Sequence, residues 1–147
     1  MWCSFVVLFT IATIGLEVFE GNKITTTEYY GLRNLESSFI LVISLFVIAV
    51  YPVSFLPLTM IITRFVNPFI ARVIIYTLLG GISGIWVFHK LYGFADKYYI
   101  NGYELERNNA IFIFGIAGLL YSLVDNHYKV NQLLKPNLLE KYTHKKF

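Results

Sequence analysis

Four long apolar blocks, separated by short polar stretches, constrain this chain more than any other feature. The blocks cover residues 2–19, 37–62, 68–89 and 109–126. An α-helix needs about 20 mostly apolar residues to cross the ~30 Å hydrocarbon core of a bilayer. Composition agrees, because 56% of the residues are hydrophobic and only 14% are charged, against roughly 25% charged in soluble domains. The sequence therefore predicts an all-α fold, an integral membrane four-helix bundle that forms a single domain.

The first two blocks each leave a choice open. The first block resembles a signal peptide in length, but no Lys or Arg precedes Lys23 and no small-residue cleavage pattern follows. We therefore expect a retained helix. The second block contains Pro52 and Pro57, each of which removes a backbone donor. It forms either one kinked helix or a helix that ends near Tyr51 and leaves by an irregular segment. We favour the kink.

The third and fourth blocks are also expected to cross the bilayer as helices. Asn67 and Pro68 form a helix-start signal, and Arg72 is then expected to extend back toward the headgroups. The fourth block is short, which also suits an interfacial helix. Such a helix needs a polar face, and residues 110–120 are apolar or Gly throughout. This block is therefore expected to cross the bilayer.

Loop charge sets the expected orientation. Four spans place both termini on one side, where seven Lys and Arg residues would lie, against five on the other side. The positive-inside rule then predicts a multi-pass protein of the cell membrane with cytoplasmic termini. The tail, residues 127–147, either lies on anionic lipid through Lys141, Lys145 and Lys146 or is simply solvated.

Small residues mark the helix contacts. Gly80 and Gly84 are four residues apart in the third block, as are Gly118 and Ser122 in the fourth. This spacing places each pair on one helix face and lets a neighbouring helix approach closely. We therefore expect an antiparallel pair of the third and fourth helices. The full set of expected packing positions is Gly80, Gly81, Gly84, Gly115, Gly118 and Ser122.

Few polar groups lie within the blocks. Tyr121, Asp125 and His127 form a candidate polar cluster, since Tyr121 and Asp125 share a helix face. Glu17 lies one turn from a block end, where we expect a solvated carboxylate rather than a buried one. Several tyrosines flank the blocks and are expected in the headgroup layer; they are Tyr29, Tyr30, Tyr92, Tyr98, Tyr99, Tyr103 and Tyr128.

The sequence offers no constellation for catalysis or metal binding. The single cysteine, Cys3, rules out an internal disulfide. His89, His127 and His144 show no metal-ligand spacing, and no basic face suits nucleic acid. We expect no enzyme activity, no cofactor and no bound metal.

Three stretches carry a resemblance. The run Ile111–Tyr121, continued to Asp125, resembles the last span of a small uncharacterised membrane-protein family of Bacillus-type bacteria, and Tyr51-Pro52 and Gly80-Gly81 look similar too. The resemblance covers about residues 40–126 and implies a multi-pass membrane protein without an assigned activity. It brings no catalytic residues.

The functional expectation follows by elimination. The chain is expected to be a non-enzymatic accessory or regulatory component of the membrane. Its partners would be the lipid bilayer and either another membrane protein or a second copy of itself. The alternative is a small oligomeric channel or transporter subunit, in which Pro52, Pro57 and the glycines supply broken helices.

Overall fold

The computed structural model describes residues 1–66, 68–93 and 98–143, with side chains as far as residue 130. Every regular element in these ranges is a helix. In chain order the elements are α1 (Trp2–Phe19), η1 (Gly21–Lys23), α2 (Leu32–Leu35), α3 (Ser37–Val50), η2 (Tyr51–Phe55), α4 (Leu56–Phe65), α5 (Phe69–Tyr92), α6 (Tyr98–Gly102) and α7 (Arg107–Thr143).

Four helical stretches in the described residues are long and apolar enough to cross a membrane. They are Trp2–Lys23, Ser37–Phe65, Phe69–Tyr92 and Arg107–Val130. The prediction of an all-helical chain with four such stretches is therefore confirmed for the part of the chain that the structure describes. The helices form where the sequence is mostly apolar, and the few hydroxyls within them, such as that of Thr13, donate to carbonyls of their own helix.

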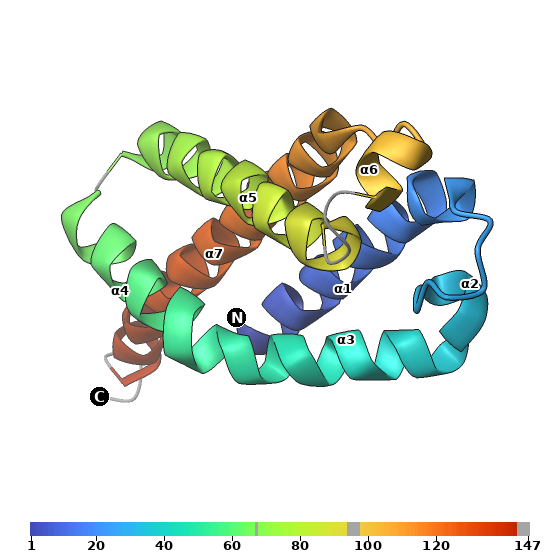
Figure 1. The fold of residues 1–147 in the computed structure, drawn as a ribbon. Helices are drawn as coiled ribbons and strands as arrows, with labels where there is room; N and C mark the ends of the chain where they lie inside the picture. Colours follow the sequence, from blue (N-terminus) through green and yellow to red (C-terminus); the bar gives the residue numbers. More distant parts are fainter. Residues whose placement is uncertain (67, 94–97, 144–147) are drawn as a thin grey trace.

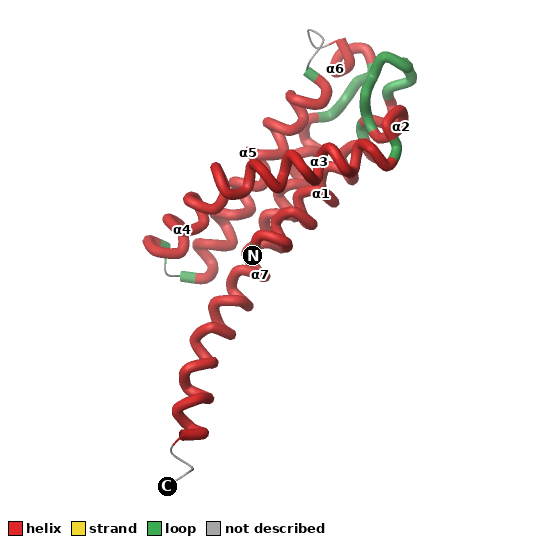
Figure 2. Tube along the Cα trace, turned by 90° about the horizontal axis from the view of Figure 1, so that it is seen from below, coloured by secondary structure: helices red, strands yellow, loops and turns green. Residues whose placement is uncertain are grey.

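The four stretches alternate in direction along the bundle (Figure 1, Figure 2). The chain start, the α4–α5 connection and the far part of α7 lie at one end, which we call the termini end. The short elements η1, α2 and α6 lie at the opposite end, which we call the loop end. An even number of antiparallel stretches thus brings both chain ends to one side.

The helices contribute unequally to the buried core. Helices α5 and α7 form the closest pair, and α1 packs against α7. Helix α3 lies outside this group and packs mainly on α1, burying only Phe39 and Val47. The bundle is therefore a core of α1, α5 and α7 with the second stretch on its flank.

Glycines bring the backbones of α5 and α7 together. A methyl group on Gly80 would overlap the carbonyl oxygen of Phe114 and lie 3.2 Å from the Cα of Gly118. On Gly84 it would lie 2.5 Å from the carbonyl oxygen of Ala110. Because these obstacles are backbone atoms, a side chain at these positions would push the helices apart. We call this contact the α5–α7 seam.

The other expected packing residues lie beside the seam. A methyl group on Gly81 would lie 3.3 Å from a methyl carbon of Ile111, and one on Gly115 would be 3.8 Å from the carbonyl oxygen of Thr77. Both are contacts that a small adjustment accommodates. Ser122 is buried, and its hydroxyl donates to a carbonyl of its own helix.

The second stretch is bent by a change in helix type. Between α3 and α4, residues Tyr51–Phe55 form a π-helical turn, with Pro52 at its start and Pro57 at the start of α4. The favoured kinked helix is therefore present, while the irregular exit after Tyr51 is wrong. A π-helical turn is a recognised cause of a sharp kink.

Two helix boundaries differ from the expected ones. Helix α5 begins after Pro68 and runs to Tyr92, whereas Asn67 lies outside the described residues. Helix α7 continues past the expected end of the fourth block, through Pro136, to Thr143. The tail residues 144–147 lie outside the described part of the chain, including His144, Lys145 and Lys146.

Candidate functional site: two buried polar clusters

The polar side chains inside the bundle gather in two clusters, one near each end. We call the first the loop-end cluster; its members are Glu17, Glu20, Tyr29, Tyr92 and Asn109. We call the second the termini-end cluster; its members are Thr59, Arg72, Tyr76, Tyr121 and Asp125. They are the strongest candidates for functional chemistry among the described residues.

Glu17 is the centre of the loop-end cluster. It lies in the last turns of α1 and is only 2% exposed. Its carboxylate accepts a hydrogen bond from the hydroxyl of Tyr29 and one of 3.2 Å from that of Tyr92, and the backbone N–H of Leu32 lies 3.5 Å away. The expectation of a solvated carboxylate at this position is wrong, because loop and α5 residues fold over it.

Glu20 extends this cluster to the start of α7. It is fully buried and accepts hydrogen bonds from the backbone N–H of Glu106 at 3.0 Å and from the side-chain amide of Asn109. Lys23 adds an ion pair of 2.9 Å. Together Glu17 and Glu20 tie the first loop, the end of α5 and the start of α7 to the end of α1.

Three of the flanking tyrosines belong to this packed region. Tyr29 stacks on Tyr92, with ring centroids 5.8 Å apart, and meets Tyr99 edge-on at 5.3 Å. All three are buried within the protein, while Tyr30, Tyr98 and Tyr128 are exposed; the interfacial position stays a prediction. Burial, with help from Tyr92 and Glu17, raises the pKa of the Tyr29 hydroxyl. Tyr29 therefore remains a proton donor toward Glu17 at neutral pH.

The termini-end cluster is built on two helix faces that meet in antiparallel register. Along α5, Arg72, Tyr76 and Gly80 follow one another at four-residue spacing, and along α7, Asp125 and Tyr121 do the same. Arg72 faces Asp125, and the rings of Tyr76 and Tyr121 meet edge-on with centroids 5.4 Å apart. The order from the termini end inward is thus a charge pair, a phenol pair and the glycine seam.

The charge pair is buried and loosely bonded. Arg72 is 5% exposed and Asp125 is 7% exposed. The nearest atoms, Nη1 of Arg72 and Oδ2 of Asp125, are 3.6 Å apart, and Nη2 lies 3.5 Å from Oδ1 of Asn126. Both distances are long for charge-assisted hydrogen bonds. The expectation that Arg72 extends back toward headgroups is wrong, because Asp125 holds it inside.

Several donors in this cluster have too few acceptors. Nε and Nη1 of Arg72 and the hydroxyls of Thr59, Tyr76 and Tyr121 are buried and have no hydrogen bond of ordinary geometry to any described residue. The phenols lie close to the hydroxyl of Thr59. Of the expected cluster, Tyr121 and Asp125 are therefore buried here, whereas His127 lies on the exposed side of α7.

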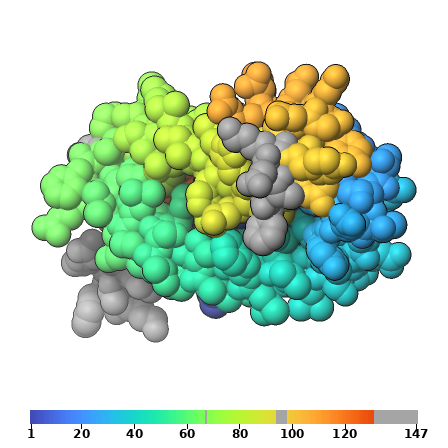
Figure 3. Space-filling model, viewed as in Figure 1, coloured from blue at the N-terminus to red at the C-terminus, as the bar shows by residue number. Residues whose placement is uncertain are grey.

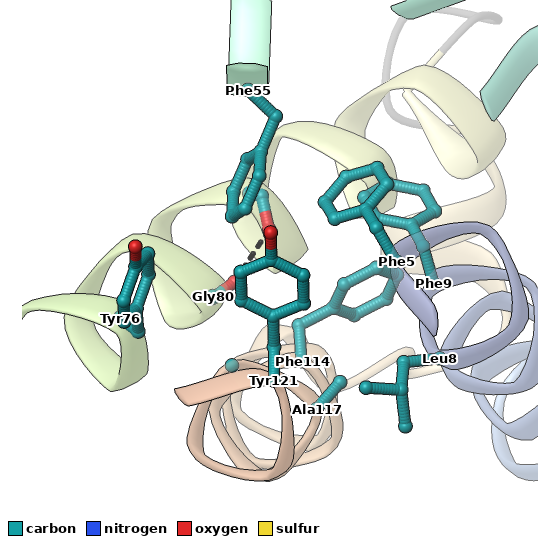
Figure 4. Close-up of a pocket in the computed structure, with 11 residues that line it drawn as sticks. Phe5, Leu8, Phe9, Phe55, Tyr76, Gly80, Phe114, Ala117 and Tyr121 are labelled. Atoms are coloured by element: carbon teal, nitrogen blue, oxygen red, sulfur yellow. Dashed lines mark hydrogen bonds between the residues drawn. The ribbon is translucent and has the colours of Figure 1, made fainter. Parts of the chain in front are cut away.

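A small cavity separates the phenol pair from the middle of the bundle. Its volume is about 30 Å³, and its walls include the rings of Phe5, Phe9, Phe55 and Phe114 (Figure 4). Such a volume holds about one water molecule. Phe55 extends from the π-helical turn η2 toward Tyr121 (Figure 4), so the bend in the second stretch supplies one wall.

Neither a metal site nor a comparison with known proteins assigns a function to the two clusters. Among the described residues, no group of three or more His, Cys, Asp or Glu side chains is placed to hold a metal ion. No family model, curated protein or solved structure matches the chain.

Proposed function

We propose that this chain is a non-enzymatic component of a membrane assembly, inserted in the bilayer through its four apolar stretches and joined to a partner's transmembrane helix through α3. The observation that carries the proposal is the position of α3 outside the core. Of its fourteen residues only Phe39 and Val47 are buried. The second stretch has the highest mean hydropathy of the four, 2.6, and the smallest buried share, 17%.

The uncovered side of α3 is broad and apolar. Its side chains form the lower edge of the molecule in Figure 3. Leu41, Val42, Leu45 and Phe46 are among the exposed residues. In a bilayer, lipid supplies no hydrophobic drive between helices, so association rests on close packing. The exposed residues of α3 offer side chains that a partner helix with small residues could pack against.

The interior supports a non-catalytic role. The buried carboxylates of Glu17 and Glu20 bind loop groups, and that of Asp125 faces Arg72. The cavity between the helices, about 30 Å³, is far smaller than the roughly 300–1,000 Å³ of ordinary ligand pockets. A second, more open hollow of about 380 Å³ lies at the loop end, lined by Phe88, His89 and Arg107 among others, and none of the three buried carboxylates lines it. The buried charges therefore serve the fold.

Site-specific photo-crosslinking tests the proposal. A photoreactive amino acid at Leu45, which is 60% exposed on α3, should give a discrete protein adduct in native membranes. The same group at Ile116, 58% exposed on α7, is the matched control and should react only with lipid. Lipid adducts alone at both positions would refute a partner on α3.

A transport role is the second candidate, and the Arg72–Asp125 pair favours it. Ionisable residues inside membrane helices commonly mark ion or proton pathways, and this pair lies beside a broken helix, as transporter sites often do. Flux through proteoliposomes of the purified protein tests this alternative. Ion flux that is lost in Asp125→Asn, with the protein still folded, would favour transport over the accessory role.

The orientation of the chain in the membrane and its relation to a protein family are also part of the proposal. Both termini are proposed to be cytoplasmic, because by sequence seven Lys and Arg residues flank the apolar stretches on the side of the termini and five flank them on the other side. A reporter fused after Phe147 should be active in the cytoplasm, and export of the reporter would reverse the assignment. The resemblance to the Bacillus-type family stays a prediction.

A further inference from the structure

We propose that α4 is a hinged cover, and that its outward movement about η2 admits water from the termini end to the termini-end cluster. This inference concerns a conformational change of the bundle. It depends on membrane insertion but not on a partner at α3. Four features of the structure support it.

The first feature is the deficit of hydrogen bonds beneath α4. Thr59 on α4, Tyr76 on α5 and Tyr121 on α7 bring three buried hydroxyls together, and the phenols interact with the hydroxyls of Thr59 and Tyr51 only in poor hydrogen-bond geometry. Two guanidinium nitrogens of Arg72 have no hydrogen bond among the described residues. Burying a polar group in an apolar interior without a good hydrogen bond is energetically costly. The closed arrangement is therefore held at a cost that water would relieve.

The second feature is the weak attachment of α4. Only Ile62 of its ten residues is buried. Met60, Ile61 and Phe65 are all more than half exposed. Helices α1 and α5 each bury a larger share of their residues, and segments with few buried apolar contacts are the ones that open first.

The third feature is the hinge itself. Pro52 and Pro57 lack the backbone N–H groups that would bond to carbonyls in the preceding turn, and the five residues Tyr51–Phe55 adopt the wider π-helical form. The hydroxyl of Ser54 bonds to the carbonyl oxygen of Val50 at 2.8 Å, which satisfies one carbonyl near the bend. Bending here therefore breaks fewer backbone hydrogen bonds than bending α1 or α5.

The fourth feature is the charge balance, which selects water as the molecule that enters. Asp125 is paired with Arg72 and also faces the charges of Lys129 and the N-terminal amine, so the cluster does not attract a cation. The poorly bonded groups are hydrogen-bond donors, and water can accept a hydrogen bond from each of them and donate one to Asp125. An opened cluster of this kind would therefore hydrate.

Cysteine accessibility provides the test, and the chain offers matched positions. In a Cys3→Ser background, Thr59→Cys places the thiol where the buried hydroxyl lies, beneath α4. Met60→Cys places it at the same depth on the outer side of α4, since Met60 is 64% exposed there. A charged, membrane-impermeant thiol reagent applied to open membrane fragments reacts only with thiols that meet water.

The expected result is that Thr59→Cys reacts about tenfold faster than Met60→Cys, because only the inner side hydrates when α4 opens. Adding Pro57→Ala, which restores a backbone donor at the hinge, should slow the Thr59→Cys reaction several-fold, whereas Pro68→Ala should leave it unchanged. Equal rates at the two thiols, or a rate unaffected by Pro57→Ala, would overturn the proposal.

A measurement on the unaltered protein covers the case in which a variant does not fold. Hydrogen exchange in lipid nanodiscs should show faster exchange for the amides of residues 59–65 in α4 than for the amides of residues 73–79 in α5. Equal protection of the two segments would also overturn the hinged cover.

Discussion

Both polar clusters bury charges against α5 and α7, but the hydrogen bonds of those charges differ between the two clusters. At the loop end, Glu17 and Glu20 accept hydrogen bonds from Tyr29, Tyr92, Asn109 and the backbone N–H of Glu106. Acceptors and donors are matched there. At the termini end, one carboxylate faces a guanidinium and three hydroxyls that have too few acceptors.

The difference has a structural origin. The donors of the loop-end cluster come largely from the first loop and from the ends of α5 and α7, where side chains and a backbone N–H surround the carboxylates. The termini-end cluster lies between α4, α5 and α7, and the glycine seam sets the spacing of α5 and α7. Its polar groups are hydroxyls and a guanidinium that face one carboxylate. The first cluster therefore stabilises the fold. The second contains polar groups that would form better hydrogen bonds in a different conformation.

The largest expected effect comes from removing one half of the charge pair. Asp125→Ala leaves Arg72 buried without its ionic partner, and we expect the free energy of unfolding to fall by about 3–5 kcal/mol. The double variant Asp125→Leu with Arg72→Met should recover most of this loss, because no charge is then left unpaired. Unfolding by dodecyl sulfate titration in mixed micelles measures both. A single variant as stable as the unaltered protein would show that Arg72 already reaches water.

Removing the centre of the loop-end cluster should cost slightly less. Glu17→Ala removes the acceptor of two phenol donors, and we expect a loss of about 3 kcal/mol in the free energy of unfolding. Glu28→Ala is the control, since Glu28 is exposed, and should stay within about 0.5 kcal/mol. The same titration gives both values. Similar, small effects at both positions would mean that Glu17 does not fasten the loops.

The seam between the clusters can be tested with a single methyl group. Gly118→Ala places this group against the carbonyl oxygen of Tyr76, and we expect a loss of about 2 kcal/mol as the helices separate. Gly115→Ala meets only an ordinary contact of 3.8 Å, and should be neutral or stabilise by up to about 1 kcal/mol through helix propensity. Thermal unfolding in detergent should rank the two variants in that order. The reverse order would place the seam elsewhere on α7.

Part of this architecture could be predicted from the sequence. The four long apolar helices follow from the length of the apolar blocks, and the four-residue spacing of Gly80 and Gly84 indicated the face that meets α7. The positions of Glu17 and Arg72 could not be predicted, because each was interpreted from its distance to a helix end alone. Their partners are remote: Tyr92 is 75 residues from Glu17. The π-helical turn has no sequence signature beyond the two prolines.

The smallest expected effect is also the most direct comparison of the clusters, because it uses one substitution at four places. Tyr29→Phe and Tyr92→Phe remove hydroxyls that donate to Glu17, and each should lower the free energy of unfolding by about 1–2 kcal/mol. Tyr76→Phe and Tyr121→Phe remove hydroxyls without a regular partner, so each should change it by less than about 0.5 kcal/mol or raise it. Ring packing is preserved in all four variants, so the difference reports on the hydroxyl alone. Four equal losses would show that the phenols of both clusters are equally well bonded, and the contrast between the two ends of the bundle would then be wrong.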